Sequence, residues 1–374
     1  MIYFDNSATS RFKPACMLRA MRNELEKSSN GGRSGHRDAV STAIKISAVR
    51  TFLCDYLNAN ELIFTKNCTE ALNIAIFGTV KYGGHALTTV NEHNSVLRPL
   101  FKLERDKSIS LSVVNPDANL KNNPAHIERM LRPETYLVAV NAVSNVTGVA
   151  SDLEAIGSIC KKRGILFLVD AAQALPHVSI NMKKLGIGFL ASAGHKGLHG
   201  PQGTGFLALN SLTGIQPLLY GGTGTNSDSV YQPHALPEAL EAGTLNSAGI
   251  IGLGEAVRWT IKNIGKINRK TEELNQIVLY GLKNMKNVEV YTPDGTECGV
   301  ISFNVKGMDS TEVGDILNER YDIAVRTGLH CAPLIHNHLG TLERGAVRVS
   351  IGYNNSKKDA LRLLDAVSEI SRPI

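Results

Sequence analysis

Short apolar segments alternate with amphipathic segments along the first half of the chain. Five apolar runs predict strands: 62–65, 85–90, 135–143, 165–170 and 188–192. Stretches between them, such as 69–80 and 153–164, have the apolar spacing of helices. The runs are continuously apolar, which is typical of strands covered on both faces. Strands alternating with helices predict βαβ units and an α/β fold with a mostly parallel sheet.

The pattern changes after residue 213. Residues 214–247 are rich in Gly, Pro, Ser and Thr and predict long ordered loops, and a long helical pattern then covers roughly 248–286. We predict a large domain over 15–250 and a smaller α+β domain over 251–374 that also includes residues 1–14. The segments that predict the α+β character of the tail are 288–292, 300–305, 310–319 and 346–353.

Composition and charge exclude several classes of protein. With 43% hydrophobic and 20% charged residues, the chain is neither a disordered protein nor a disulfide-dense scaffold. A net charge of +6 over 374 residues is not the footprint of a nucleic-acid binder. We see no signal peptide and no apolar run near 18 residues, so we expect no membrane span and a cytoplasmic protein with reduced cysteines.

Polar side chains follow several predicted strands at the point where each strand ends. Asp170, Lys196 and His93 lie at or just after such ends, as do Asn145 and Gln173. Because ligands bind at the carboxyl ends of parallel strands, we expect one rim of the sheet to gather these residues. Each also has a structural interpretation, since Asp170 could cap a helix and Lys196 could be an exposed loop lysine.

A phosphate site is predicted near the same rim. Asn67, Thr69 and Glu70 open a predicted helix in the arrangement of a capping box, and such an N-terminus can also hold a phosphate. The chain contains no Walker A and no GxGxxG motif, which argues against a nucleotide. A phosphate site beside a buried Asp, a reactive Lys and a stacking His points to pyridoxal phosphate.

The chain resembles the class V aminotransferase family of fold-type-I pyridoxal-phosphate enzymes, and within it the group II cysteine desulfurases of the Suf or selenocysteine-lyase-like kind. The resemblance covers essentially the whole chain and implies a homodimer. It is carried by nine motifs in order: FDNSATS (4–10), FTKNCTEALN (64–73), NEHNS (91–95), VSNVTG (143–148), VDAAQALPH (169–177), GHKGLHGPQGTG (194–205), LEAGTLN (240–246), VRTGLHCAP (325–333) and VRVSIGYN (347–354).

The resemblance also implies a role for each matching residue. Lys196, Cys331 and His93 are the implied catalytic residues, with Lys196 forming the Schiff base. Arg348 is implied to clamp the substrate carboxylate, with Arg326 and Asn145 nearby. The implied cofactor-binding residues are Lys196, Asp170, Gln173, His93, Asn145, Thr69, Cys68, His195 and Thr244, of which Thr244 comes from the second subunit.

Cys331 distinguishes a desulfurase from an aminotransferase. The resemblance implies that its thiolate attacks the sulfur of L-cysteine, that L-alanine leaves, and that a persulfide remains for a sulfur-acceptor protein. An unperturbed thiol is only slightly ionised at neutral pH, so the pocket or the substrate must help. Alternatively, Cys331 is a buried small hydrophobe. The neighbouring His330, His336 and His338 also suggest zinc, but their spacing fits no common zinc pattern and we expect no metal.

Other functions remain open at this point. Selenocysteine lyase is the nearest alternative, followed by an aminotransferase, lyase or racemase with an incidental Cys331, and by a cofactor-binding partner without turnover. The sulfur acceptor is not identified by the sequence, nor is its destination, such as iron–sulfur cluster assembly. Two residues depart from the family pattern: Ala193 replaces a hydroxyl residue three positions before Lys196, and Cys68 precedes Thr69. We therefore expect weaker cofactor retention.

Overall fold

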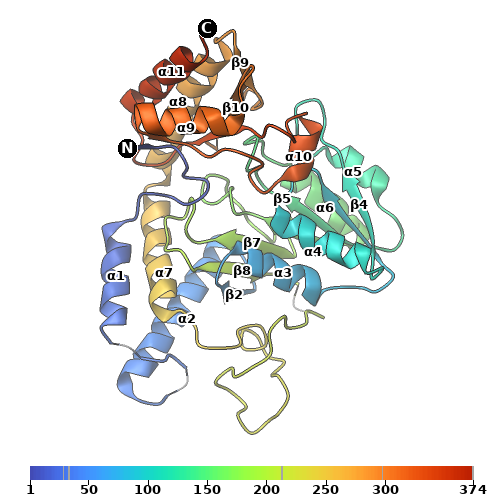
Figure 1. The fold of residues 1–374 in the computed structure, drawn as a ribbon. Helices are drawn as coiled ribbons and strands as arrows, with labels where there is room; N and C mark the ends of the chain where they lie inside the picture. Colours follow the sequence, from blue (N-terminus) through green and yellow to red (C-terminus); the bar gives the residue numbers. More distant parts are fainter. Residues whose placement is uncertain (28, 33, 212–213, 297, 373–374) are drawn as a thin grey trace.

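A seven-stranded sheet forms the centre of the computed structural model, which describes residues 1–374 except 28, 33, 212–213, 297 and 373–374 (Figure 1). One strand, Gly205–Leu209, is antiparallel to both of its neighbours, and all the other pairs of adjacent strands in this sheet are parallel. The mostly parallel sheet expected from the sequence is therefore confirmed. All five strands expected from the sequence are present. The order across the sheet is β2 (Glu61–Thr65), β8 (Gly205–Leu209), β7 (Phe189–Ala193), β6 (Leu166–Asp170), β5 (Thr135–Asn141), β3 (His85–Thr89) and β4 (Ser110–Val114).

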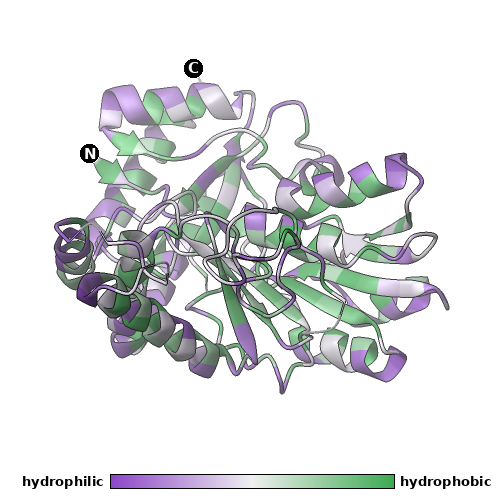
Figure 2. Cartoon of the chain, turned by 90° about the horizontal axis from the view of Figure 1, so that it is seen from below, coloured by the Kyte–Doolittle hydropathy of each residue, from purple (hydrophilic) through white to green (hydrophobic). Residues whose placement is uncertain are grey.

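The central strands are apolar on both faces because helices cover both faces. Successive residues of a strand point to opposite sides. On β5, Val138 and Val140 therefore belong to one core and Leu137 and Ala139 to the other. In Figure 2 the central strands are largely hydrophobic, while the covering helices carry hydrophilic residues as well. Helices α2 (Arg37–Leu57), α5 (Pro124–Met130), α6 (Leu153–Arg163) and α7 (Ser247–Lys262) contribute to the first core, and α3 (Cys68–Gly78) and α4 (Asn94–Arg105) to the second.

A smaller unit packs above the carboxyl ends of the large sheet (Figure 1). Its antiparallel sheet and three of its helices share one core, which also contains Phe4 from the N-terminal segment, whereas the short helix Pro333–His338 packs through Ile335 against Val90 and Val146 of the large unit. The limits of the two predicted domains stay a prediction. The elements are strands β12 (Val347–Ser350), β10 (Val300–Val305) and β9 (Val288–Val290) in that order, helices α8 (Ile264–Lys283), α9 (Ser310–Tyr321), α10 (Pro333–His338) and α11 (Lys357–Ile370), and the pair β1 (Ile2–Tyr3) and β11 (Ile323–Ala324).

The long helical pattern over 248–286 is two helices rather than one. Helix α7 ends at Lys262 and α8 begins at Ile264, so Asn263 alone lies between them. The Asn263 side chain donates to the carbonyl of Trp259 at 2.8 Å, a local bond that competes with continued helix. Helix α7 packs against α2 and against α1 (Ala15–Leu25), whereas α8 packs against α11.

The segment after β8 is a long loop region, as expected. From residue 214 to Asn246 it contains no helix or strand in the part of the chain that the structure describes, and it projects away from the large sheet (Figure 1). Several large apolar side chains on it are exposed: Leu218, Leu219, Tyr220, Val230 and Tyr231. Within the described ranges, no helix is both long and apolar enough to span a membrane.

Candidate active site

A cavity of about 210 Å³ lies where the parallel strands of the large sheet end. Asn141, Asp170 and Ala193 are the last residues of β5, β6 and β7, and all three line it. The smaller unit contributes to the opposite wall. Every site residue predicted from the sequence lines this cavity except Thr244: Cys68, Thr69, His93, Asn145, Asp170, Gln173, His195, Lys196, Arg326, Cys331 and Arg348.

Asp170 and Lys196 provide the charges at the floor of the cavity. Asp170 is buried, and its Oδ1 accepts a hydrogen bond from the amide of Ala172 at 2.9 Å. Burial lowers the pKa of Lys196, and the charge of Asp170 partly opposes that shift. A lysine with a lowered pKa is more often the neutral amine that attacks a carbonyl carbon. This pair therefore fits a group that needs both a nucleophilic amine and a carboxylate partner.

Cys68 contacts the same carboxylate. Its Sγ donates to Oδ1 of Asp170 at 3.4 Å. Burial, and then the Asp170 charge, raise the pKa of the Cys68 thiol well above its usual range, so the thiol stays protonated. Cys68 therefore contacts Asp170 as a hydrogen-bond donor. Its direct role in binding a cofactor stays a prediction.

The N-termini of two helices form the side of the cavity that is suited to an anion. The Asn67 side chain caps α3 by accepting from the amide of Glu70 at 2.9 Å, as the predicted cap requires. Thr69 lies in the first turn, with its Oγ1 2.8 Å from Oγ of Ser95. Nδ1 of His195 is buried and has no hydrogen-bond partner among the described residues. A helix N-terminus beside this unpartnered imidazole nitrogen fits a phosphate.

The position of Ala193 gives a direct test of cofactor retention. Ala193 lines the cavity, whereas the adjacent Ser192 does not, since neighbouring strand residues point to opposite faces. We expect Ala193→Ser to add a phosphate donor and slow cofactor loss about tenfold, the effect of one hydrogen bond to a charged group. The measurement is cofactor released during dialysis of the wild type and the variant. Ser192→Ala is the control and should release cofactor like the wild type; equal release from Ala193→Ser would contradict the prediction.

His93 is held beside the cavity by its own helix. It is the N-cap residue of α4, and its Nδ1 accepts from the amide of Ser95 at 3.0 Å. Burial lowers the pKa of His93 to about 4, so the ring is neutral near pH 7. With Nδ1 accepting, we assign its proton to Nε2. The ring is thus fixed in orientation and uncharged, as a residue stacked on a cofactor ring requires.

Arg348 and Arg326 make the upper wall positive. Arg348 is only 1% exposed; its guanidinium donates to Oδ1 of Asp5 at 3.0 Å and to the carbonyl of Asn145 at 3.1 Å. Its Nε–H has no partner among the described residues. Burial lowers the pKa of Arg348 to about 10, so it stays charged at neutral pH. Arg348 pairs with Asp5, whereas Arg326 forms no ion pair with a carboxylate among the described residues, and this excess positive charge favours an anionic substrate group.

Cys331 lies at the mouth of the cavity with an exposed side chain. The Arg326 guanidinium lies 3.7 Å from its Sγ. The backbone is held from both sides: Asn145 Nδ2 donates to the carbonyl of His330 at 2.8 Å, and the amide of Asn94 donates to the carbonyl of Cys331 at 2.7 Å. An accessible thiol beside a fixed cation is suited to nucleophilic chemistry.

Several lining residues were not assigned roles from the sequence. Ser7, Ser95, Asn141 and His330 also line the cavity. Ser7, Ser95 and His330 lie inside motifs that carried the resemblance, so those motifs were a usable signal. Asn141 gave no separate signal, because an Asn at a strand end has many structural uses.

Glu92 is a further residue that the sequence analysis did not single out. It is fully buried, Oγ1 of Thr89 donates to its Oε1 at 2.7 Å, and its Oε2 has no partner among the described residues. Burial, with a smaller contribution from the nearby Asp170 charge, raises the pKa of Glu92 to about 8. The carboxyl group is therefore protonated at neutral pH, which leaves Asp170 as the local negative charge.

This burial predicts a pH-dependent stability difference for Glu92→Gln. Between the unfolded pKa of about 4.3 and the folded pKa of about 8, the folded chain holds a proton that the unfolded chain has lost. Stability of the wild type therefore falls as pH rises through this window. The variant lacks the penalty, so its melting temperature relative to the wild type should rise from pH 5 to pH 9. The exposed Glu128→Gln is the control; a difference that stays flat with pH for Glu92→Gln would refute the prediction.

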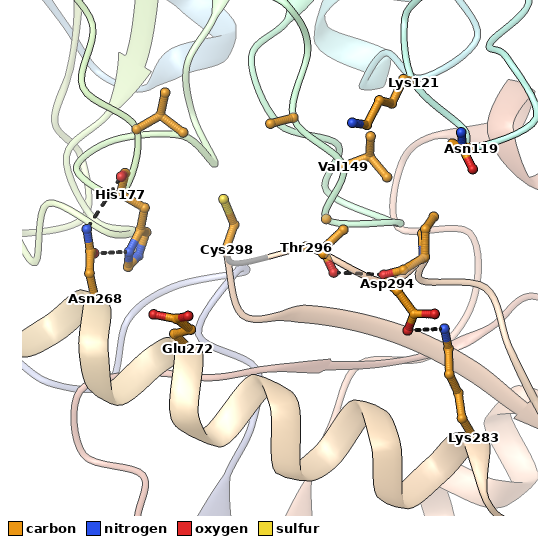
Figure 3. A pocket seen from close by; sticks show the side chains of 15 residues that line it. Asn119, Lys121, Val149, His177, Asn268, Glu272, Lys283, Asp294, Thr296 and Cys298 are labelled. Carbon is orange, nitrogen blue, oxygen red and sulfur yellow. Dashed lines mark hydrogen bonds and ion pairs between the residues drawn. The ribbon is translucent and has the colours of Figure 1, made fainter.

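A second cavity of about 750 Å³ lies between the two units (Figure 3). In it the His177 Nδ1 and Asn268 Oδ1 atoms are 2.9 Å apart, and Lys283 pairs with Asp294 at 2.6 Å. It contains none of the predicted site residues and shares no lining residue with the smaller cavity. The smaller cavity is therefore the candidate active site.

Comparisons with known proteins agree with this geometry. The sequence matches the Aminotransferase class-V family over residues 2–363. It is 36% identical to a "Probable cysteine desulfurase" of Methanothermobacter thermautotrophicus, covering 99% of this chain and 94% of that protein. A "Probable cysteine desulfurase" of Pyrococcus abyssi is 34% identical, with coverages of 100% and 95%. The solved cysteine desulfurase of Thermococcus onnurineus superposes with a TM-score of 0.91 at 34% identity, covering 99% of this chain and 94% of that one.

Proposed function

The chain belongs to the class V aminotransferase family and uses pyridoxal phosphate, and we propose that it is a cysteine desulfurase. It converts L-cysteine to L-alanine and leaves a persulfide on Cys331 for transfer to a sulfur acceptor. The observation that carries this proposal is the exposed Cys331 thiol, which shares one cavity with Lys196, Asp170 and Arg348. An aminotransferase does not need a thiol at this place.

The residues of the cavity fit the cofactor. Lys196 would hold it covalently, Asp170 would pair with its ring nitrogen, and His93 would lie against the ring. Thr69 and His195, whose buried Nδ1 lacks a partner among the described residues, would hold its phosphate. When bound, pyridoxal phosphate supplies an electron sink for negative charge at the substrate α-carbon.

Four residues of the cavity have separate roles in the proposed reaction. Arg348 binds and orients the substrate carboxylate through its unpartnered Nε–H edge. Lys196, whose lowered pKa favours the neutral amine, moves the proton at the α-carbon. The Cys331 thiolate attacks the substrate sulfur: a sulfur–sulfur bond forms, the carbon–sulfur bond breaks, its electron pair stays with carbon, and a proton completes L-alanine. The Arg326 guanidinium beside Sγ stabilises the attacking thiolate.

A homodimer is part of the proposal. Thr244 is exposed and lies outside the cavity of its own chain, as expected for a residue that contacts the phosphate in a partner subunit. The loop that leads to it carries exposed apolar side chains, including Tyr220, Val230 and Tyr231. Burial of such side chains against a second copy would stabilise the pair.

Substrate choice and destination complete the proposal. L-Cysteine is the first substrate, and L-selenocysteine is the close alternative because the same residues would act on selenium. A sulfur-acceptor protein, a cytoplasmic location, group II membership and a role in iron–sulfur cluster assembly stay predictions that rest on the resemblance.

The test is product formation by the holoenzyme. Incubation with L-cysteine and a reductant should give L-alanine and sulfide in equal amounts, and a parallel incubation should use L-selenocysteine. Oxoacid formation without sulfide would instead support an aminotransferase or lyase. Turnover of L-selenocysteine alone would move the assignment to selenocysteine lyase.

A further inference from the structure

The backbone at Cys331 is unusual for two consecutive residues. His330 has φ +50° and Cys331 has φ +58°, in the left-handed region that favours glycine. Such a conformation persists only where the surroundings enforce it. The bonds from Asn145 and Asn94 hold the two carbonyl groups. They do not fix the His330 ring, which lines the cavity next to Cys331.

A buried chain of side chains holds that ring. Nδ1 of His330 lies 3.3 Å from Nε2 of His336, and Nδ1 of His336 lies 2.8 Å from Oγ1 of Thr341. The two rings have centroids 5.4 Å apart and all three residues are buried. His336 lies on α10, which begins two residues after Cys331. The contact between His330 and His336 therefore links the two ends of the short segment that contains Cys331.

Both rings are uncharged at neutral pH. Burial, followed by the charge of Arg348, lowers the pKa of His330 far below its usual range, and burial lowers the pKa of His336 to about 4. A neutral imidazole offers one donor and one acceptor, and the Thr341 hydroxyl offers both. The Thr341 hydroxyl donates to the carbonyl of His336 at 3.3 Å and therefore accepts from Nδ1–H of His336, whose Nε2 in turn accepts from Nδ1–H of His330. Both bonds are thus satisfied, and the neutral rings do not repel each other.

We propose that His336 is a positioning residue for Cys331, acting through His330. It does not line the cavity and touches no reacting atom. By fixing His330 in the left-handed turn, it keeps the Cys331 sulfur beside Arg326 and in reach of the substrate sulfur. The proposal rests on the proposed function, because it concerns how the Cys331 thiol is oriented toward the sulfur of the substrate.

The test compares two histidines of the same helix. His336→Leu removes both ring bonds at similar volume, whereas His338→Leu alters an exposed residue of α10. We expect His336→Leu to lower kcat for alanine formation about 10–100-fold, the cost of misplacing a reacting atom. KM should stay within about twofold of the wild type, because Arg348 is untouched. His338→Leu should match the wild type, and His336→Gln should recover part of the loss.

Two controls keep the result decisive. Cofactor content and thermal unfolding show whether His336→Leu is misfolded. If it is, kcat of His336→Gln and of Thr341→Val is compared with that of the wild type instead. An unchanged kcat in these variants, or a loss that appears equally in kcat and cofactor content, would overturn the positioning role. Alkylation of the Cys331 peptide by iodoacetamide, followed by mass spectrometry, should slow about threefold or more in His336→Leu. This readout needs no turnover, so an inactive wild type would defeat the proposed function while alkylation still decides the role of His336.

Discussion

Replacement of Cys331 by alanine is expected to abolish L-alanine formation from L-cysteine. Removal of an enzymatic nucleophile costs on the order of 10⁴–10⁶ in rate. Cys68, the other thiol of the cavity, cannot substitute, because burial and then the Asp170 charge raise its pKa well above the usual range and keep it protonated. The variant should keep its cofactor, since Lys196 and Asp170 are unchanged. Cys331→Ala is thus predicted to be a coloured, folded and inactive protein.

The measurement is alanine formed per cofactor, with Cys16→Ala as the matched control. Cys16 lies on α1, outside the cavity, and its loss should leave the rate unchanged. Mass spectrometry of the wild type after a single exposure to L-cysteine without reductant should show one added sulfur on the Cys331 peptide. If Cys331→Ala turned over like the wild type, the thiol would be incidental and a lyase or aminotransferase would be the better assignment.

Replacement of Lys196 by alanine is expected to reduce turnover by a similar factor, on the order of 10⁴ or more, but for another reason. It removes the amine that holds the cofactor and moves the proton at the α-carbon. Lys196 is half-buried in the cavity beside Asp170, so its loss leaves that carboxylate without its cationic partner. Lys196→Arg keeps the positive charge without the nucleophilic amine, and separates charge from covalent chemistry.

Borohydride reduction provides the decisive readout. In the wild type it should fix the cofactor to the peptide that contains Lys196, as detected by mass spectrometry. Neither Lys196→Ala nor Lys196→Arg should retain cofactor covalently, and both should lack alanine formation. Cofactor trapped on another lysine, with activity preserved, would show that the Schiff-base lysine has been misassigned.

Much of the site follows from the position of residues relative to strand ends. Asp170 ends β6 and Lys196 follows the end of β7; because parallel strands end at one edge, their proximity was predictable. Arg348 and Cys331 depended on the resemblance, because they lie in the smaller unit and no local pattern places them over the sheet.

Other features depend on contacts that no local pattern contains. Asp5 pairs with Arg348 across 343 residues of sequence. Glu92 is a charged residue by type, and only the packing of the fold makes it a buried acid. The edge strand β4 alternates Ser with apolar residues and gives a weak strand signal. The left-handed turn at Cys331 occurs at non-glycine residues, so composition does not reveal it.

The single-residue connection at Asn263 has a mechanical consequence. Helix α7 packs within the large unit and α8 within the small one. The two units are therefore joined here by two helices that follow each other without a flexible linker. Any rotation of the small unit over the cavity must pass through the dihedral angles of this one residue and through the N-terminal segment that carries Phe4 and Asp5. The joint is therefore a pivot with few degrees of freedom, and a rotation that carried Arg348 and Cys331 away from the sheet would have to break the hydrogen bonds that Asn94 and Asn145 make with them.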